Sequence, residues 1–272
     1  MRAKAIYLLK AFARRLRWLP SDLLLRQRNR DVLMPPRGIS FVGRSDFEQT
    51  GCEFLRHFVE LGGLRPSDRV LDVGCGIGRM AIPLTGYLES GSYVGFDVGR
   101  EMVTWCRRNV TPRHPSFEFA WAPIFNRKYN PFGSVGAAEF RFPYPDSSFD
   151  FAFATSLFTH LLAEEVRHYL AETARVLRPG SRCLLTFFLL TPEAVAELTA
   201  ERAAPPFRYP IEGGLTTDAR QPEEATAYRV EAVRSMLAEA GLEIADPIHF
   251  GGWANTPAAP SMQDIVIATR TR

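Results

Sequence analysis

A glycine-rich segment between an apolar run and a helical run constrains the fold of this 272-residue chain most strongly. Residues 70–79 read Val-Leu-Asp-Val-Gly-Cys-Gly-Ile-Gly-Arg, so an apolar strand leads into Gly74, Gly76 and Gly78. Glycine lets the backbone turn sharply and lets a ligand approach without meeting a Cβ, and the following helix N-terminus offers free N–H groups. The segment therefore predicts a strand-turn-helix unit with a ligand above the turn.

Short β-branched or aromatic runs alternate with longer helical patterns from about residue 46 onward, as is typical of βαβ units. The pattern predicts one α/β domain with a seven-stranded sheet and helices on both faces. Strands are expected at 69–73, 93–97, 117–121, 149–155, 183–190, 243–250 and 264–269, and helices at 46–61, 79–88, 100–109, 163–177 and 228–240.

Two long stretches interrupt this alternation, residues 123–142 and residues 191–227. Loops of this length inside a compact domain are usually functional. We interpret 191–227 as a lid over the pocket for the molecule on which the protein acts, its acceptor. A disordered surface insertion is the alternative. The expected organisation is a basic amphipathic segment at 1–37 followed by a catalytic domain at 38–272.

Charge and cysteine content limit the class of protein. The net charge of +3 is too small to indicate nucleic-acid binding. Four scattered cysteines predict neither a disulfide framework nor a zinc site, and no clustered carboxylates suggest a metal ion. Without an apolar run long enough to cross a bilayer, the sequence favours a cytoplasmic protein.

The basic residues concentrate at the N-terminus, where residues 1–37 carry a net charge of +8. On a helical wheel, residues 4–19 place Leu, Ile and Phe side chains on one half and Lys and Arg on the other. This pattern predicts either a peripheral membrane contact at the inner membrane surface or a helix whose apolar half packs on the domain.

Two acidic residues indicate which ligand the glycine turn accepts. Asp72 precedes Gly74 by two positions, and Asp97 closes the next strand, where a carboxylate reaches ribose hydroxyls in such folds. The turn reads GxGxG, unlike the GxGxxG of dinucleotide sites. A carboxylate beside the turn suits an ammonium group better than a phosphate. S-adenosylmethionine has an ammonium, a sulfonium, a ribose and an adenine, but no phosphate, and Met102 is placed to lie against the adenine.

These residues resemble motifs I and II of class I S-adenosylmethionine-dependent methyltransferases. The resemblance continues at 142–150 and 175–180, which are similar to the family's approaches to its fourth and fifth strands, and spans roughly residues 46–270. It implies a Rossmann-like, mostly parallel sheet with an antiparallel last strand. It also implies that S-adenosylmethionine is held by Asp72, Gly74, Cys75, Gly76, Gly78, Asp97, Met102, Glu139 and Thr155.

One position departs from the family pattern. The segment after the third strand reads Ala122-Pro123-Ile124 and lacks the acidic residue that often accepts the adenine amino group. Glu139 substitutes for it, or a backbone contact does.

The acceptor is less well defined, because function depends on the site and not on the fold. Residues 155–160, after the fourth strand, lack the Asn/Asp-Pro-Pro-aromatic motif of enzymes that methylate planar amino groups; Asn130-Pro131-Phe132 precedes that strand and is expected to form a turn. We expect O-methylation of a small molecule or glycan. The alternatives are N- or C-methylation of a metabolite, a non-catalytic cofactor-binding module and a dehydrogenase.

Two histidines are predicted as the general base for a hydroxyl acceptor. His160 follows the fourth strand at the ligand edge of the sheet, and its unperturbed pKa of about 6.5 suits proton removal near neutrality. His249 is the second choice, beside the possible aromatic wall at 250–253. The alternatives are a packing role for His160 and a solvated loop position for His249.

Overall fold

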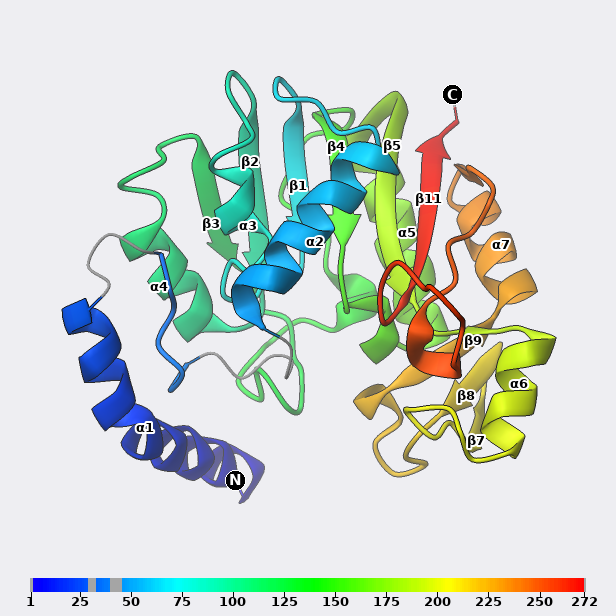
Figure 1. Cartoon of the computed structure of the whole chain (residues 1–272), viewed down its shortest axis with the longest axis horizontal. Coiled ribbons are helices and arrows are strands. Elements are labelled where there is room, and N and C mark those ends of the chain that lie inside the picture. The colour runs from blue at the N-terminus through cyan, green and yellow to red at the C-terminus, as the bar shows by residue number, and fades with distance from the viewer. Residues whose placement is uncertain (1, 29–32, 40–45, 272) are drawn as a thin grey trace. The chain divides into compact units, whose positions relative to one another are not determined.

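The computed structural model describes residues 2–28, 33–39 and 46–271, and the chain divides into two units. The first comprises Met1–Glu60 and Arg65–Phe140, and the second comprises Leu61–Leu64 and Arg141–Arg272. Figure 1 shows the helices and strands of both. The expected segment 1–37 therefore lies in the first unit, and its residues Arg2–Arg28 form helix α1.

The first unit carries three parallel strands and the helices between them. Strands β1 (Arg69–Val73), β2 (Ser92–Asp97) and β3 (Phe117–Trp121) pair in that order, with Val73 opposite Phe96 and Asp97 opposite Trp121. The helical elements are α2 (Phe47–Glu60), α3 (Ala81–Leu84), α4 (Arg100–Asn109) and η1 (Ala137–Glu139). Four of the five residues of β1 are buried, as expected for a parallel strand inside a sheet.

The second unit contains the remaining strands of the main sheet and a smaller sheet. Strand β4 (Phe149–Ala154) pairs in parallel with β5 (Leu177–Phe187), and β11 (Asp264–Arg270) pairs antiparallel with both β5 and β10 (Leu242–Ile244). Outside residues 191–227, its helical elements are η2 (Phe158–His160), α5 (Ala163–Val176), α7 (Val230–Glu239) and η4 (Gly252–Ala254).

The main sheet has seven strands in the order β10-β11-β5-β4-β1-β2-β3. It is mostly parallel, and its last strand is antiparallel. This confirms the predicted Rossmann-like α/β fold class.

Three predicted elements differ clearly from the observed ones. The helix expected at 79–88 is regular only over Ala81–Leu84, after which i→i+3 hydrogen bonds tighten the chain. The strand expected at 243–250 ends at Ile244, because Pro247 has no N–H for a ladder bond and only His249 pairs again, with Ile265. Strand β5 begins at Leu177, so Pro179-Gly180 lies within it beside a shift of register.

Residues 191–227 are folded, unlike the expected irregular loop. They form α6 (Pro192–Thr199), β7 (Tyr209–Ile211), β8 (Gly214–Thr216) and η3 (Pro222–Glu224), and enter β9 (Thr226–Arg229). With β6 (Leu189–Leu190), the strands make a second sheet in the order β6-β9-β8-β7.

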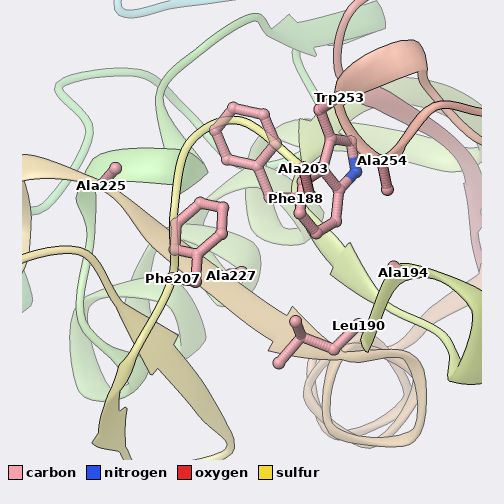
Figure 2. Packing of buried hydrophobic residues seen from close by; sticks show 9 residues of the cluster. All are labelled: Phe188, Leu190, Ala194, Ala203, Phe207, Ala225, Ala227, Trp253 and Ala254. Atoms are coloured by element: carbon pink, nitrogen blue, oxygen red, sulfur yellow. The ribbon is translucent and has the colours of Figure 1, made fainter. Parts of the chain in front are cut away.

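An apolar cluster supports this smaller sheet (Figure 2). Phe188, Phe207 and Trp253 are buried there with ring centroids 5.3–5.5 Å apart, and the other members are Leu190, Ala194, Ala203, Ala225, Ala227 and Ala254. Trp253, which was expected in an aromatic wall at 250–253, is therefore buried in this cluster.

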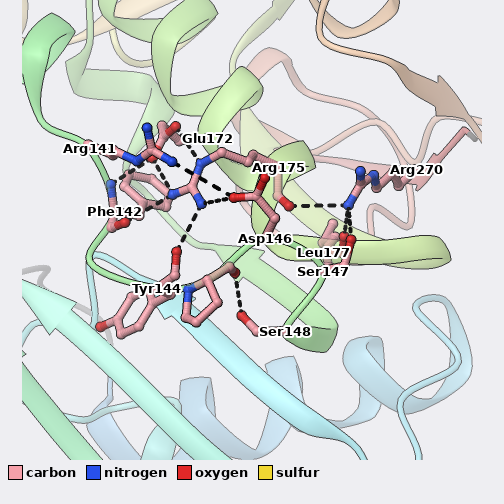
Figure 3. Close-up of polar contacts among 11 residues, drawn as sticks. Arg141, Phe142, Tyr144, Asp146, Ser147, Ser148, Glu172, Arg175, Leu177 and Arg270 are labelled. Atoms are coloured by element: carbon pink, nitrogen blue, oxygen red, sulfur yellow. Dashed lines mark hydrogen bonds and ion pairs between the residues drawn. The ribbon is translucent and has the colours of Figure 1, made fainter.

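An ion-pair network joins the segment before β4 to α5 (Figure 3). Arg175 donates to Glu172 and Asp146 and to the carbonyl oxygens of Phe142 and Tyr144, at 2.6–2.9 Å. The backbone N–H of Phe142 donates to Glu172 in turn. The sequence similarity at 142–150 and 175–180 thus has a structural counterpart, because one guanidinium connects the two motifs.

Candidate functional site

The glycine turn after β1 has the backbone that a close-approaching ligand needs. Gly74, Gly76 and Gly78 have φ of +87°, +52° and +80°, values that side-chain-bearing residues rarely adopt. The N–H groups of Gly74 and Cys75 donate to the carbonyl of Phe96, which ties the turn to β2. A Cβ at Gly76 would meet no atom within 4 Å, so this part of the turn faces open space.

Asp97 connects this turn to the loop after β2. Its carboxylate accepts from the N–H of Gly76 at 2.9 Å and from the N–H of Gly99 at 2.6 Å, and the residue is half-buried. Burial raises its pKa, and the two N–H donors oppose that rise. The structure therefore brings Asp97 and the glycine turn together.

Asp72 lies beneath the turn as a buried carboxylate with unfilled hydrogen-bonding capacity. Its Oδ2 accepts from the Tyr93 hydroxyl at 2.6 Å, whereas its Oδ1 has no hydrogen-bond partner. Burial, opposed by the Tyr93 hydrogen bond and reinforced by the nearby Asp97, raises the pKa of Asp72 to about 8. A cationic ligand group would relieve both the missing contact and the repulsion between the two carboxylates.

Tyr93 is the residue of this site that the sequence analysis missed. It is fully buried on β2, its ring stacks on Phe117 with centroids 5.1 Å apart, and a Cβ on Gly95 would lie 2.6 Å from its hydroxyl. The available signal was a tyrosine within an otherwise apolar strand, since a buried hydroxyl needs a hydrogen-bond partner. Glycine at 95 leaves room for that hydroxyl to reach Asp72.

The other predicted cofactor residues of the first unit lie in different settings. Met102 is buried on α4, and a Cβ on Gly99 would lie 2.2 Å from its methyl group. Cys75 is buried in the turn, whereas Glu139 is an exposed residue of η1. Asn130 donates from Nδ2 to the carbonyl of Ile124 at 2.8 Å, consistent with the expected turn at 130–132.

In the second unit, the chain leaves β4 through a polar cluster that sequence reasoning also missed. Ser156 has φ of +56°, its N–H donates to Thr186 Oγ1 at 2.7 Å, and the hydroxyls of Ser156 and Thr186 both donate to Gln263 Oε1. Thr155 is the half-buried residue just before this cluster. Left-handed backbone at a non-glycine residue costs conformational energy and is common at functional sites.

The two predicted bases lie in this unit, in different surroundings. His160 is half-buried in η2, and its Nδ1 lies 3.2 Å from the carbonyl oxygen of Glu223. Since a carbonyl only accepts, Nδ1 carries the proton in this contact and Nε2 is the basic nitrogen. His249 is half-buried, and its backbone pairs with Ile265.

Among the described residues, no group of three or more His, Cys, Asp or Glu side chains could hold a metal ion. Within the same residues, every helix is too short or too polar to span a bilayer.

Comparison with known proteins agrees with this geometry. Residues 71–185 match the family model described as a methyltransferase domain. The chain is 35% identical over 155 residues to a phthiotriol/phenolphthiotriol dimycocerosates methyltransferase of Mycobacterium ulcerans, covering 55% of this chain and 46% of that protein. It is 33% identical over 145 residues to 27-O-demethylrifamycin SV methyltransferase of Amycolatopsis mediterranei, covering 51% and 46%.

A solved structure supports the fold. The magnesium protoporphyrin IX methyltransferase of Synechocystis PCC 6803, determined with bound SAH, superposes with a TM-score of 0.53 at 17% identity, covering 86% of this chain and 92% of that one.

The fold, the glycine turn and the family match together define an α/β domain of the methyltransferase class. Residues 71–185 form a methyltransferase domain of the class I S-adenosylmethionine-dependent type, and S-adenosylmethionine is the cofactor of this domain. The chain spans about half the length of the curated relatives it matches.

Proposed function

We propose that this protein transfers a methyl group from S-adenosylmethionine to a hydroxyl of a small molecule or glycan. The observation that carries S-adenosylmethionine as the methyl donor is the unpartnered, buried Oδ1 of Asp72 beside a glycine turn with open space above Gly76. In this proposal, Asp72 faces the ammonium end of the cofactor and Asp97 accepts from the ribose hydroxyls. When bound, the cofactor supplies an electrophilic methyl group on a sulfonium.

The remaining predicted residues have supporting roles in this proposal. Gly74, Cys75, Gly76 and Gly78 give the cofactor close access to the backbone, and Met102, Glu139 and Thr155 complete its surroundings. Residues 191–227 serve as a lid over the acceptor pocket, a role that suits a folded insertion in a chain of this class.

His160 is the proposed general base for a hydroxyl acceptor, and His249 is the second choice. The hydrogen bond from His160 Nδ1 to the Glu223 carbonyl supports this order, because it assigns the ring proton and makes Nε2 the basic nitrogen. General-base catalysis typically contributes about 10²–10⁴-fold to a rate, which sets the loss expected for His160→Ala.

The test measures transfer of a labelled methyl group to hydroxyl, amine and carbon acceptors, with His160→Ala, His249→Ala and, as matched control, His168→Ala on α5. We expect hydroxyl acceptors to be labelled and His160→Ala to lower kcat while the cofactor Kd stays constant. Labelling of amine or carbon acceptors alone would establish the N- or C-methyltransferase alternative. Cofactor binding without transfer to any acceptor would favour a non-catalytic module.

We also propose a cytoplasmic location with peripheral contact between residues 1–37 and an inner membrane surface. The +8 charge of this segment supports the contact, because each Lys or Arg near an anionic leaflet contributes about 1 kcal/mol to binding. Vesicle binding by the full chain, but not by a chain beginning at Asp31, is the expected result.

A further inference from the structure

Helix α1 packs on the first unit through a side different from the one its sequence pattern suggests. The half-buried positions between residues 7 and 22 are Tyr7, Ala11, Arg14, Trp18, Ser21 and Asp22. Spacings of three and four place them on one face of the helix. The alternative prediction for this helix was that its apolar half packs on the domain. The structure contradicts that prediction, because a mixed polar and aromatic face packs instead.

Specific polar and aromatic contacts hold that face. Arg14 donates to the carbonyl of Gly38 at 2.7 Å, and Asp22 accepts from the N–H groups of Arg37 and Gly38 at 2.8 and 3.0 Å. The Tyr7 ring meets the Phe132 ring edge-on, with centroids 6.0 Å apart. The orientation of α1 is thus determined by polar contacts, which turn its large apolar side chains outward.

The outward side chains form what we call the apolar stripe. Leu8, Leu9, Phe12, Leu16 and Leu19 are each between 51% and 67% exposed. Contiguous apolar surface of this kind marks an interaction site in a folded protein. Exposed Lys10 and Arg17 lie along one side of the stripe and make that rim cationic, whereas Arg15, on the other side, pairs with Glu101 at 2.7 Å.

A loop of the first unit contacts the half-buried face of α1. Residues 123–135 are held by hydrogen bonds from Phe125 N to Val135 O and between the backbones of Asn126 and Asn130. The loop exposes Phe125 and Phe132, together with Arg127 and Lys128 near its tip. Phe132 is also the residue that contacts Tyr7 of α1.

We propose that the apolar stripe forms a lipid-binding surface that seats on an anionic bilayer. The inference rests on the membrane contact proposed above and names the surface that makes it. Bulky apolar side chains with a cationic rim match the acyl boundary and the charged headgroups of such a bilayer. A protein groove would not require the excess of positive charge in this segment.

The test is co-sedimentation with vesicles of phosphatidylcholine, with and without phosphatidylglycerol, at low and high salt. The stripe variant combines Leu9→Ser, Phe12→Ser and Leu16→Ser; the rim variant combines Lys10→Glu and Arg17→Glu. The matched control combines Val195→Ser and Met262→Ser, which replace exposed apolar residues of the second unit. Calorimetric binding of S-adenosylhomocysteine to each variant verifies its fold.

We expect the full chain to bind phosphatidylglycerol vesicles, the stripe variant to bind at least tenfold more weakly, and the control to bind normally. The rim variant should lose the salt-sensitive part of the binding. A stripe variant that binds like the full chain would overturn the inference but leave a purely electrostatic membrane contact. No binding by the full chain would overturn both. A stripe-dependent dimer in sedimentation velocity without lipid would assign the surface to a second copy instead.

Discussion

Two buried aspartates, one in each unit, have opposite hydrogen-bonding environments. Asp72 and Asp264 are each 1% exposed. Asp264, at the start of β11, accepts from the N–H of Leu189, the N–H of Gly251 and the indole N–H of Trp253, at 2.6–2.8 Å. Asp72 accepts one hydrogen bond, from Tyr93, and its second oxygen has none.

In our proposal, this difference separates a carboxylate that holds the fold from one retained for the cofactor. A buried polar group without a partner costs free energy, so folding alone gives no reason to keep a carboxylate at position 72. The pKa values of the two aspartates differ in the same sense, since the carboxyl with fewer hydrogen bonds has the higher pKa. Burial raises the pKa of Asp264 to about 6, against three opposing N–H donors, whereas Asp72 rises to about 8.

Replacing Asp264 should give the largest effect on stability. Asp264→Leu leaves three buried N–H donors without an acceptor, and we expect the free energy of unfolding to fall by roughly 3 kcal/mol or more. Asp264→Asn, which keeps one acceptor oxygen, should lose less. Denaturant unfolding measures both, with Asp246→Leu at an exposed position as control. An Asp264→Leu protein as stable as the control would remove the contrast between the two sites.

The pH dependence of stability should separate the two carboxylates. A raised pKa means that the native state keeps a proton which the unfolded state releases, so the stability contribution is lost as pH rises through the native pKa. The contribution of protonated Asp264 to the free energy of unfolding therefore falls with rising pH between its ordinary pKa of 3.8 and its native pKa of about 6. For Asp72 the decline extends from 3.8 to about 8. Between pH 6 and 8, we expect a fall of roughly 2 kcal/mol in unfolding free energy without cofactor.

Asp72→Asn should flatten that decline, and saturating S-adenosylhomocysteine should make it shallower in the parent protein. An unchanged slope in Asp72→Asn would show that other groups cause the decline. Urea titrations at matched ionic strength across this range provide the measurement.

A smaller effect is expected for Tyr93→Phe, which removes only the hydroxyl that orients Asp72. Loss of this hydrogen bond should cost about 1 kcal/mol and weaken cofactor binding about fivefold. Tyr87→Phe, at a half-buried tyrosine of the same unit, serves as control. Equal cofactor affinity in Tyr93→Phe and the parent protein would mean that Asp72 needs no orienting partner.

The parts of the fold predicted from sequence are those with strong local signals. The strands at 69–73 and 117–121 and the helix at 100–109 have the predicted bounds, because apolar runs and helical spacing set them locally. The end of β10 and the position of Pro179-Gly180 within β5 depend on pairing with β11 and β4, which the sequence does not encode locally.

The site divides in the same way. Asp72 and the glycines follow from a contiguous motif, Asp97 follows from its place at the end of the next strand, and the structure joins Asp97 to Gly76. Tyr93 and the Thr186–Gln263 contact were missed because their partners are 21 and 77 residues away along the chain. For α1, the wheel identified the apolar residues but not the face that packs, which polar contacts with Gly38 determine.

The most direct test of this account is calorimetric binding of S-adenosylmethionine to Asp72→Asn, paired with denaturant unfolding of the same protein without cofactor. The account predicts a ten- to hundredfold weaker affinity, about 1.5–3 kcal/mol, with unfolding free energy at pH 8 equal to or above that of the parent protein. Affinity within twofold of the parent protein, or a large loss of stability, would contradict the claim that this carboxylate is kept for the cofactor and not for the fold.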